Sequence, residues 1–311
     1  MLRLYDSVLT MAINQKFWAS LIGSALLLSP VLWAQHSPDP AYRREVERQR
    51  AEQLKDLKEN WIPLAGLFWL KSGANTFGAD AANAIVLPQG TAPAKAGVFE
   101  LQGETVTVKL NPGTTATIDG QPVTTASLQS DASGKPTILA LGRLRMHVIK
   151  RQQRIGIRLK DLQSPALRKF HALSYFPINP AYRVEAKWLP QPTTVDVSDI
   201  LGDVVATPVK GVAQFTLNGQ QLTLTPIGGD PAKGLFFAFS DQTTKTETYP
   251  GGRFLDTGPV KNGTVTLDFN TAYNPPCAVT PYATCPRPPK EDRLPVAIPA
   301  GEKYDRAHGD Y

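Results

Sequence analysis

Short runs in which apolar and polar residues alternate, separated by tight-turn signals, recur along this chain from residue 64 to residue 269. The run Thr105–Leu110 (TVTVKL) is one example, and Ile155–Leu159 (IGIRL) is another. Successive side chains of a strand point to opposite faces, so this alternation predicts strands with one buried face. Several such strands in close succession are typical of an antiparallel sandwich or barrel. The sequence therefore predicts an all-β fold with minor α content.

Two dipeptides indicate where the chain reverses direction between strands, Asp119-Gly120 and Asn218-Gly219. A two-residue hairpin turn needs positive φ at both central residues, and Asn, Asp and Gly tolerate this conformation best. The second turn should place Phe215 opposite Leu222 on the paired strands. These turns predict one hairpin in each half of the chain.

Two fully apolar runs predict strands that are buried more completely. Leu64–Leu70 contains no polar residue, which fits a strand buried on both faces. Leu235–Phe239 is a second run of this kind, and we expect it to pair with Thr246–Tyr249. The polar tip of that hairpin would be Asp241–Lys245.

The segment 35–62 is predicted to form an amphipathic helix ahead of the strands. Asp39 is a preferred N-cap residue, and Pro40 fits the first helical position. A narrow apolar stripe at helical spacing indicates a helix that lies on the surface of a domain. The stripe consists of Val46, Leu54, Leu57 and Trp61.

The proline-containing piece Phe176–Pro180 is the expected boundary between two packed β-rich halves. Its two prolines suppress regular structure. We place the first half at 63–176 and the second at 181–311, where a segment rich in proline and cysteine ends the fold. The chain has 27 prolines and 24 glycines in 311 residues, which indicates many turns rather than disorder.

Residues 1–34 have the pattern of a secretion signal. Lys16 supplies the positive charge, Phe17–Leu28 is the apolar region, and Pro30 interrupts it before a plausible cleavage site after Ala34. The apolar run is too short to span a bilayer comfortably. We therefore expect an exported, soluble protein, periplasmic or secreted, without a stable transmembrane anchor once the signal is removed.

A formal net charge of +6 permits an anionic partner, but nucleic-acid binding needs a clustered basic surface. The densest cluster is Lys150–Arg154, followed by Arg158 and Lys160. It contains no aromatic residues, so we interpret it as a solvated hairpin turn and predict no nucleic-acid partner.

The two cysteines, Cys277 and Cys285, lie eight positions apart in the proline-rich segment. In an exported protein this spacing predicts a disulfide closing a small loop, worth about 2–3 kcal/mol. A pair of thiols is the alternative. A Cys-x7-Cys pair alone is weak evidence for metal, because zinc needs four ligands. We predict no metal and no cofactor.

No serine-hydrolase, metalloprotease, phosphate-loop or dinucleotide motif occurs in the sequence. The candidate site therefore rests on clustered polar residues, most of which follow Thr248. Asp256 and Asp268 could act as an acid–base pair, with Tyr273 as a third catalytic candidate. Arginines could hold an anionic ligand bidentately. The candidates for ligand binding are Arg158, Asp161, Arg253, Asn270, Asn274, Tyr282 and Arg293. The structural alternative is that Asp268 and Asn270 satisfy a turning backbone and that Arg253 is a buried ion-pair partner.

The stretch Ser72–Leu87 (SGANTFGADAANAIVL) resembles the opening strands of forkhead-associated domains. In that family an arginine after the glycine contacts phosphothreonine, and here the position is Ala79. No Ser-x-x-His follows at the family's distance. The resemblance implies a related fold for the first half, without phosphopeptide binding.

Several longer pieces resemble a bacterial and archaeal family, the domain of unknown function 1684 family. The resemblance extends over about residues 60 to 303, and Asp292 stands where we expect the family to have Asn. Its pieces are LAGLFWL (64–70), GIRLKD (156–161), GRFLD (252–256), DFNTAYNPPC (268–277), TPYATCP (280–286) and LPVAI (294–298). The family has no assigned activity, so the resemblance implies no catalytic residue.

Three functions remain open on these grounds. The first is a ligand-binding or envelope-associated β module for an anionic or saccharide-like ligand. The second is a hydrolase-like enzyme that uses Asp256 or Asp268 with Arg253. The third is a thiol redox protein that uses Cys277 and Cys285, which would require an electropositive, accessible setting.

Overall fold

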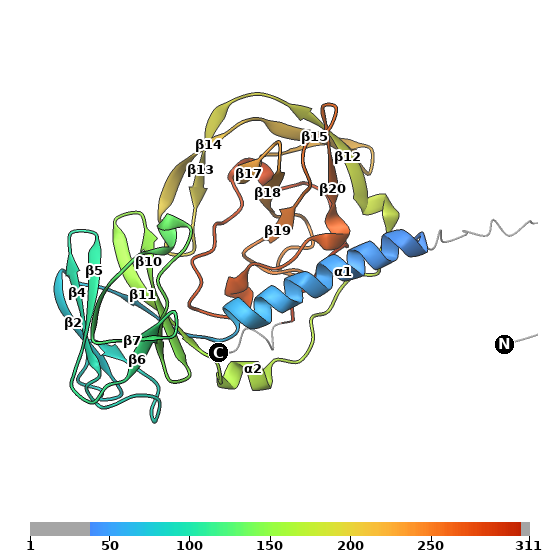
Figure 1. Cartoon of the computed structure of the whole chain (residues 1–311). Coiled ribbons are helices and arrows are strands. Elements are labelled where there is room, and N and C mark those ends of the chain that lie inside the picture. Colours follow the sequence, from blue (N-terminus) through green and yellow to red (C-terminus); the bar gives the residue numbers. More distant parts are fainter. Residues whose placement is uncertain (1–37, 306–311) are drawn as a thin grey trace, which may run out of the picture. The chain divides into compact units, whose positions relative to one another are not determined.

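The computed structural model describes residues 38–305, so the predicted signal segment 1–34 lies outside the described residues. The predicted all-β class is confirmed, because one N-terminal helix precedes a series of mainly antiparallel sheets (Figure 1). The short helical pieces between and after the strands are η2 (Asp131–Ser133), α2 (Pro165–Lys169), η3 (Pro180–Tyr182), η4 (Phe269–Thr271), η5 (Pro276–Ala278) and η6 (Lys290–Asp292).

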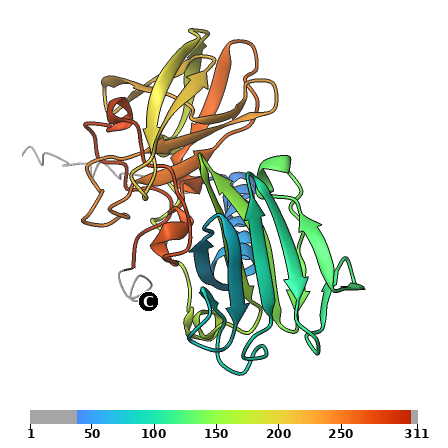
Figure 2. The same ribbon diagram turned by 90° about the vertical axis from the view of Figure 1, so that its left-hand side faces the viewer.

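Two sheets form the first group of strands, which Figure 2 shows side by side. The six-stranded sheet contains, in order, β1 (Leu64–Trp69), β11 (Arg154–Asp161), β10 (Leu144–Arg151), β9 (Leu139–Leu141), β6 (Ala116–Ile118) and β7 (Gln121–Val123). The five-stranded sheet contains β3 (Ile85–Val86), β2 (Gly73–Gly78), β4 (Gly97–Gln102), β5 (Thr105–Leu110) and β8 (Thr125–Leu128). Both sheets contribute to one apolar core, in which the rings of Phe77 and Phe99 stack with centroids 4.5 Å apart.

Three smaller sheets form the second group. The four-stranded sheet contains β16 (Gln220–Leu224), β15 (Val212–Leu217), β12 (Arg183–Leu189) and β20 (Thr264–Asp268). The others are β17 (Gly228–Asp230), β18 (Gly234–Phe239) and β19 (Arg253–Asp256), and the pair β13 (Thr193–Ser198) and β14 (Val204–Val209). Phe237, Phe239 and Phe269 are fully buried in their common core, which Leu294, Val296 and Ile298 of the C-terminal region complete.

Both predicted two-residue hairpins are present. Asp119 and Gly120 have φ of 49° and 77°, and Asn218 and Gly219 have φ of 51° and 75°. These positive values are the ones that the turn requires, and few other residues adopt them without strain. Phe215 pairs with Leu222 as expected.

Two strand predictions need correction. The run at Leu64 forms β1, but β1 is an edge strand and its residues alternate between buried and half-buried instead of being buried throughout. Strand β18 pairs with β19, not with Thr246–Tyr249. Asp241 is therefore not at an exposed tip: its side chain is fully buried against Arg253.

The N-terminal helix begins as the sequence predicts, because Asp39 Oδ1 accepts a hydrogen bond from the N–H of Ala41 at 2.7 Å. It comprises α1 (Pro40–Asp56) and a π-helical turn, η1 (Leu57–Trp61). The Arg50 guanidinium donates to the carbonyl of Asn270, and this contact attaches α1 to the turn after β20 (Figure 1). Within residues 38–305 we find no helix with the length and apolarity to cross a membrane.

The segment after η5 runs back toward the first group of strands. The Arg287 N–H donates to the carbonyl of Ser198 at 2.7 Å, and the Ile200 N–H donates to the carbonyl of Cys285 at 3.1 Å. Gly252 allows this close packing: its φ is +92°, and a Cβ atom there would lie only 2.4 Å from Cγ of Pro288. These contacts hold the segment at the end of β13, and the hydrogen bond from Arg151, the last residue of β10, to Thr284 places Thr284 at the end of that strand.

Candidate functional site

A cleft of about 530 Å³ lies where α1, β19 and the C-terminal segment meet the end of β10. We call it the central cleft. Its lining residues are Glu52, Gln53, Asp56, Leu57, Trp61, Arg151, Phe236, Phe254, Asp256, Tyr273, Asn274, Pro276, Thr284, Cys285 and Pro286. A volume of this size is within the range of small-molecule sites in proteins, about 300–1,000 Å³.

Aromatic side chains form one wall of the central cleft. Phe236 on β18 and Phe254 on β19 meet edge to face with centroids 4.9 Å apart, and Tyr273 packs against Phe254 at 5.8 Å. Trp61 reaches the cleft from η1, and its indole N–H donates to Asp56 Oδ2 at 3.0 Å. The wall is therefore apolar, with hydrogen-bonding groups at its edges.

Two arginines meet at Thr284 on another side of the cleft. Arg151 Nε donates to Thr284 Oγ1 at 2.9 Å, and Arg158 Nη2 donates to the same oxygen at 3.4 Å. Arg151 also forms an ion pair with Asp131 at 2.7 Å. Because the threonine oxygen accepts from both arginines, its own proton is available for an acceptor elsewhere. The group Arg151–Thr284–Arg158 thus presents only donors.

Arg158 is the cation in this group that has no ion pair of its own; Asp131, which pairs with Arg151, attracts it only at longer range. Arg158 is only 6% exposed, and its guanidinium forms no ion pair with any residue in 38–305. Its Nε–H donates to no described residue, and the guanidinium lies 5.6 Å from the ring centre of Trp61. Burial, and then the neighbouring Arg151, lower the pKa of Arg158 to about 10, so it remains cationic at neutral pH. A buried cation without a carboxylate is costly unless an anion accompanies it.

The sheet neighbour of Arg158 does not supply that anion. Arg158 on β11 pairs with His147 on β10. Burial and the positive charge of Arg158 lower the pKa of His147 to about 4, so this imidazole is neutral at physiological pH. The sheet therefore holds Arg158 in place without balancing its charge.

Asp256 and Tyr273 face each other at the aromatic wall. The Tyr273 hydroxyl donates to Asp256 Oδ2 at 2.7 Å. The carboxylate reaches solvent, but nearby rings exclude water from much of its surface, and this desolvation raises the pKa of Asp256. Burial and the adjacent Asp256 charge raise the pKa of Tyr273, which keeps it protonated. Two of the three predicted catalytic candidates, Asp256 and Tyr273, therefore line the central cleft.

Two amide oxygens in the cleft wall accept no hydrogen bond from the described residues, Gln53 Oε1 and Asn274 Oδ1. The amide nitrogens of both residues donate to groups that do not line the cleft. Asn274 Nδ2 donates to Glu302 Oε1 at 2.8 Å and to the carbonyl of Lys303 at 3.0 Å. Gln53 Nε2 donates to the carbonyl of Thr271 at 2.9 Å. Buried acceptors without a donor are rare in proteins and usually have a functional reason.

Cys277 and Cys285 are neighbours, and the structure carries both as thiols. The Cys277 N–H donates to Cys285 Sγ at 3.3 Å. The contact between the thiols lowers the pKa of Cys277 and raises that of Cys285. Cys285 lines the central cleft, whereas Cys277 borders a separate hollow of about 610 Å³. The disulfide stays a prediction.

We expect the mature protein, isolated from an oxidising compartment, to be two hydrogens lighter than its reduced form. Because the loop between the cysteines is short, reduction should lower the free energy of unfolding by about 2–3 kcal/mol. Intact-mass measurement with and without reductant tests this, and the Cys277→Ser and Cys285→Ser double variant serves as the control. Full alkylation of both thiols in untreated protein would contradict the prediction.

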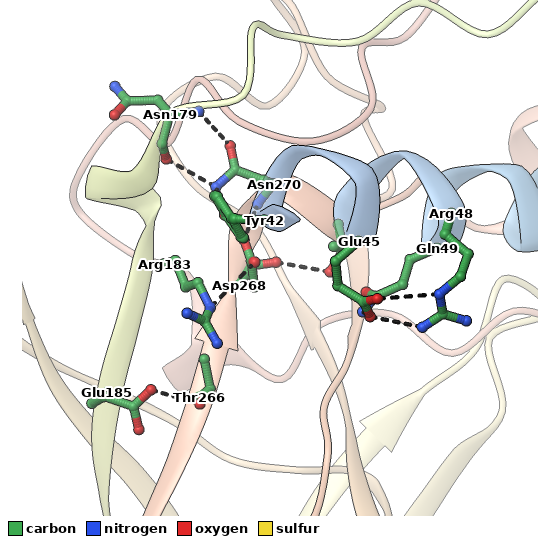
Figure 3. A network of polar contacts seen from close by, with 11 residues as sticks. Tyr42, Glu45, Arg48, Gln49, Asn179, Arg183, Glu185, Thr266, Asp268 and Asn270 are labelled. Atoms are coloured by element: carbon green, nitrogen blue, oxygen red, sulfur yellow. Dashed lines mark hydrogen bonds and ion pairs between the residues drawn. The ribbon is translucent and has the colours of Figure 1, made fainter. Parts of the chain in front are cut away.

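Asp268 and Asn270 lie at the other end of α1, in the network of Figure 3. The Tyr42 hydroxyl donates to Asp268 Oδ1 at 3.0 Å, and Asp268 also accepts from the Asn270 N–H. Asn270 Nδ2 donates to Tyr42, Asp268 and the carbonyl of Asn179. Burial and Asp268 raise the pKa of Tyr42, so it remains a donor. These contacts satisfy a turning backbone, and Asp268 does not line the cleft with Asp256.

Arg253 is placed in the interior of the second group of strands. It is fully buried, forms an ion pair with Asp241 and donates to the carbonyls of Ile298 and Ala300. These partners engage both Nη groups, while the Nε–H has no partner among the described residues, and the contacts hold β19 to the C-terminal region. Asp161 has a similar position: it is buried and accepts from Arg143 at 2.9 Å.

The remaining two candidates also lie away from the central cleft. Arg293 is exposed and borders the same hollow as Cys277. The Tyr282 N–H donates to Thr280 Oγ1 at 3.4 Å, which forms part of the local turn. Of the residues singled out in the sequence, the structure brings Arg158, Asp256, Tyr273 and Asn274 to the cleft.

Sequence reasoning missed the partners that these four residues have. Arg151 belongs to the cluster interpreted as a solvated turn, yet its side chain is only 29% exposed and contacts Thr284. Thr284 belongs to one of the quoted family pieces but shows no chemical signal by itself. Trp61 is the last residue of the apolar stripe of the N-terminal helix, and this position predicts packing rather than a site. Only contacts between segments that lie far apart in the sequence identify these residues.

Residues 168–303 match the family described as "Protein of unknown function (DUF1684)". An uncharacterised protein of Haloarcula marismortui, solved by NMR, is 36% identical; the match covers 45% of this chain and 80% of that one, with a TM-score of 0.37. No curated protein matches the chain significantly.

Two solved FHA domains are also similar, each at 15% identity and a TM-score of 0.22. One is the FHA domain of FhaA in complex with an intracellular domain, and the match covers 30% of this chain and 97% of that one. The other comes from work on phosphothreonine-dependent FHA interactions, with 34% and 96% covered. The match over residues 168–303 includes the GRFLD and YNPPC pieces, and through it the chain belongs to the DUF1684 family of proteins of unknown function.

Proposed function

We propose that this protein binds a small organic anion in the central cleft, with the anionic group on Arg151, Thr284 and Arg158 and the apolar part on the aromatic wall. One observation carries the proposal: Arg158 is nine-tenths buried next to a second arginine and has no carboxylate partner among the described residues. An incoming anion would supply the missing charge and accept hydrogen bonds from both arginines and from the threonine hydroxyl.

The cellular compartment in which the protein acts is inferred separately from its binding site. Residues 1–34 have the pattern of a secretion signal. We propose on this basis that the protein binds its ligand in the periplasm or outside the cell. Fractionation of cells that produce the full chain tests this, since the mature protein should leave the cytoplasm and begin near Gln35.

The Arg158→Met variant should lose anion binding. Calorimetric titration with benzoate, a planar anion, should show binding to the unaltered protein, and the variant should bind at least tenfold more weakly because a hydrogen bond to a charged group contributes about 1.5–3 kcal/mol. Arg158→Lys should fall between the two, since it keeps the charge and loses the planar fork.

Arg145→Met is the matched control, because Arg145 lies on the adjacent strand and donates only to the carbonyls of Gly142 and Leu144. Its affinity for benzoate should equal that of the unaltered protein. The proposal fails if benzoate binds equally well to Arg158→Met, or if neither benzoate nor inorganic phosphate binds to the unaltered protein.

A second candidate function, acid–base catalysis on the bound ligand, is favoured by the Tyr273–Asp256 hydrogen bond at the cleft wall. Partial desolvation raises the pKa of Asp256, and a carboxyl group with a raised pKa is a better proton acceptor than an ordinary aspartate. In this second proposal Asp256 is the acid–base group and Tyr273 positions it. Arg253 and Asp268 take no part, because neither lines the cleft.

A further inference from the structure

We infer that the ligand of the central cleft is an acidic saccharide, that is, a sugar ring that carries a carboxylate or a phosphate group. This inference rests on the proposed function, and it adds the chemistry of the part of the ligand that the arginines do not contact. The sugar hydroxyls would donate to Asp256, Gln53 and Asn274, while one face of the ring would lie on the aromatic wall.

The side of the cleft formed by α1 and β19 presents acceptors, in contrast to the donors at Thr284. Gln53 Oε1 and Asn274 Oδ1 accept no hydrogen bond within residues 38–305, and Asn274 is only 7% exposed. Both hydrogens of Asn274 Nδ2 are taken by Glu302 and Lys303, which do not line the central cleft. Asn274 lines the cleft, and its side-chain oxygen is buried without a donor from the described residues. A ligand that satisfies these acceptors must supply several donors.

Hydroxyl groups fit these acceptors better than an ammonium group does. Glu52 and Asp56 also line this side, but Glu52 pairs with Arg48, and Asp56 accepts from Asn60 and Trp61. Two of the other three acceptors are neutral amide oxygens, which do not compensate a positive charge. The third, Asp256, is partly desolvated, and burial raises the pKa of this carboxyl, which disfavours a fixed negative charge at that position. A ligand with several neutral O–H donors meets both conditions.

The aromatic wall adds the requirement for a flat, weakly polar face. Phe236, Phe254, Tyr273 and Trp61 offer ring surface next to the acceptors. One face of a sugar ring consists largely of C–H groups, which pack on aromatic rings while the hydroxyls at the rim form hydrogen bonds. The cleft thus offers donors for an acid group, acceptors for hydroxyls and an apolar face between them. A sugar acid or a sugar phosphate matches all three.

Calorimetric titration with five probes tests the inference: glucuronate, glucose 6-phosphate, neutral glucose, acetate and inorganic phosphate. At least one acidic sugar should bind tenfold or more tightly than its bare anion and than glucose, a factor that corresponds to 1.4 kcal/mol. The comparison of glucuronate with glucose 6-phosphate distinguishes a carboxylate from a phosphate as the acid group.

The variants separate the two parts of the ligand. Gln53→Met should reduce the affinity for the acidic sugar severalfold and leave that for the bare anion unchanged. Gln49→Met is its matched control one helical turn earlier, because this half-buried side chain hydrogen-bonds to Glu45 and does not line the central cleft. Arg158→Met should reduce the binding of the acidic sugar and of the bare anion together.

The outcomes distinguish this inference from the proposed function. If the bare anions bind as tightly as the acidic sugars, and Arg158→Met weakens all of them, the anion site stands and the saccharide inference is overturned. The same holds if Gln53→Met has no larger effect on the sugar than Gln49→Met. If no probe binds, both the proposed function and the inference fail.

Discussion

Replacing Asp241 by Asn should lower the free energy of unfolding by about 3–5 kcal/mol, because the change leaves a buried arginine without its counter-charge. Asp241 and Arg253 form an ion pair whose side chains are both 0% exposed. Asp241 Oδ1 also accepts from the N–H and the hydroxyl of Thr243 at 2.6 Å each. The shape of the side chain is preserved in the variant, so the loss reports the charge and its hydrogen bonds.

Urea denaturation at pH 7 measures this effect, and Asp230→Asn is the matched control. Asp230 also forms an ion pair, with Lys210, but this pair is exposed to solvent. Exposed pairs contribute little to stability, so the control should unfold at the urea concentration of the unaltered protein. Equal shifts in the two variants would show that the buried pair is not a main support of β19 and the C-terminal region.

The Asp292→Asn variant should be more stable than the unaltered protein at pH 8 and should lose most of this advantage at pH 5. Asp292 is 1% exposed; Oδ1 accepts from the Thr225 N–H at 3.0 Å, and Oδ2 has no partner among the described residues. Burial raises the pKa of this carboxyl from 3.8 to about 8. The folded state must therefore release a proton, and bury a charge, as the pH rises to 8.

The direction in which the stability changes with pH follows from proton linkage. Between pH 4 and pH 8 the folded state binds more protons at Asp292 than the unfolded state, so the stability falls as the pH rises through this window. At 1.36 kcal/mol per pKa unit, the contribution that is present at low pH and lost by pH 8 amounts to at most about 5 kcal/mol. Asparagine has no such proton to lose.

Thermal or urea unfolding measured from pH 5 to pH 8.5 tests this prediction. Burial also raises the pKa of Glu302 to about 7 and lowers that of His147 to about 4. These two groups give slopes of opposite sign below about pH 6.5, so together they should add little pH dependence there in Asp292→Asn. Asp119→Asn is the control, because Asn suits the same hairpin turn. A pH dependence that is unchanged in Asp292→Asn would show that this carboxyl does not bind a proton in the folded state at neutral pH.

The features that could be predicted from the sequence depend on neighbours in the chain. The Asp119-Gly120 and Asn218-Gly219 turns, and the start of α1 at Asp39, need only residues a few positions apart. Positive φ and N-terminal capping are local properties, so the residue type is sufficient to indicate them. The alternation of apolar residues likewise predicts strands, although it does not show that β1 lies at an edge.

The features that could not be predicted depend on which distant segments meet. Asp241 looks like a polar turn residue, and its burial follows only from Arg253 on the neighbouring strand. Arg151 looks like one charge in a solvated cluster, and its role follows only from Asp131 and Thr284. For the same reason, Asp256 and Asp268 appear as a pair in the sequence but lie in separate hydrogen-bond networks.

The contacts between the arginines and Thr284 also have a consequence for the order in which the protein gains its binding capacity. Arg151 and Thr284 are 133 positions apart, and Arg158 and Thr284 are 126 apart. Contacts of such separation form late in folding, since a long loop must close before they contribute. A chain shortened before residue 284 could build the first group of strands, but it would lack Leu294, Val296 and Ile298 of the second core, and it would bind no anion. Ligand affinity therefore measures whether synthesis and folding have reached the last segment of the fold.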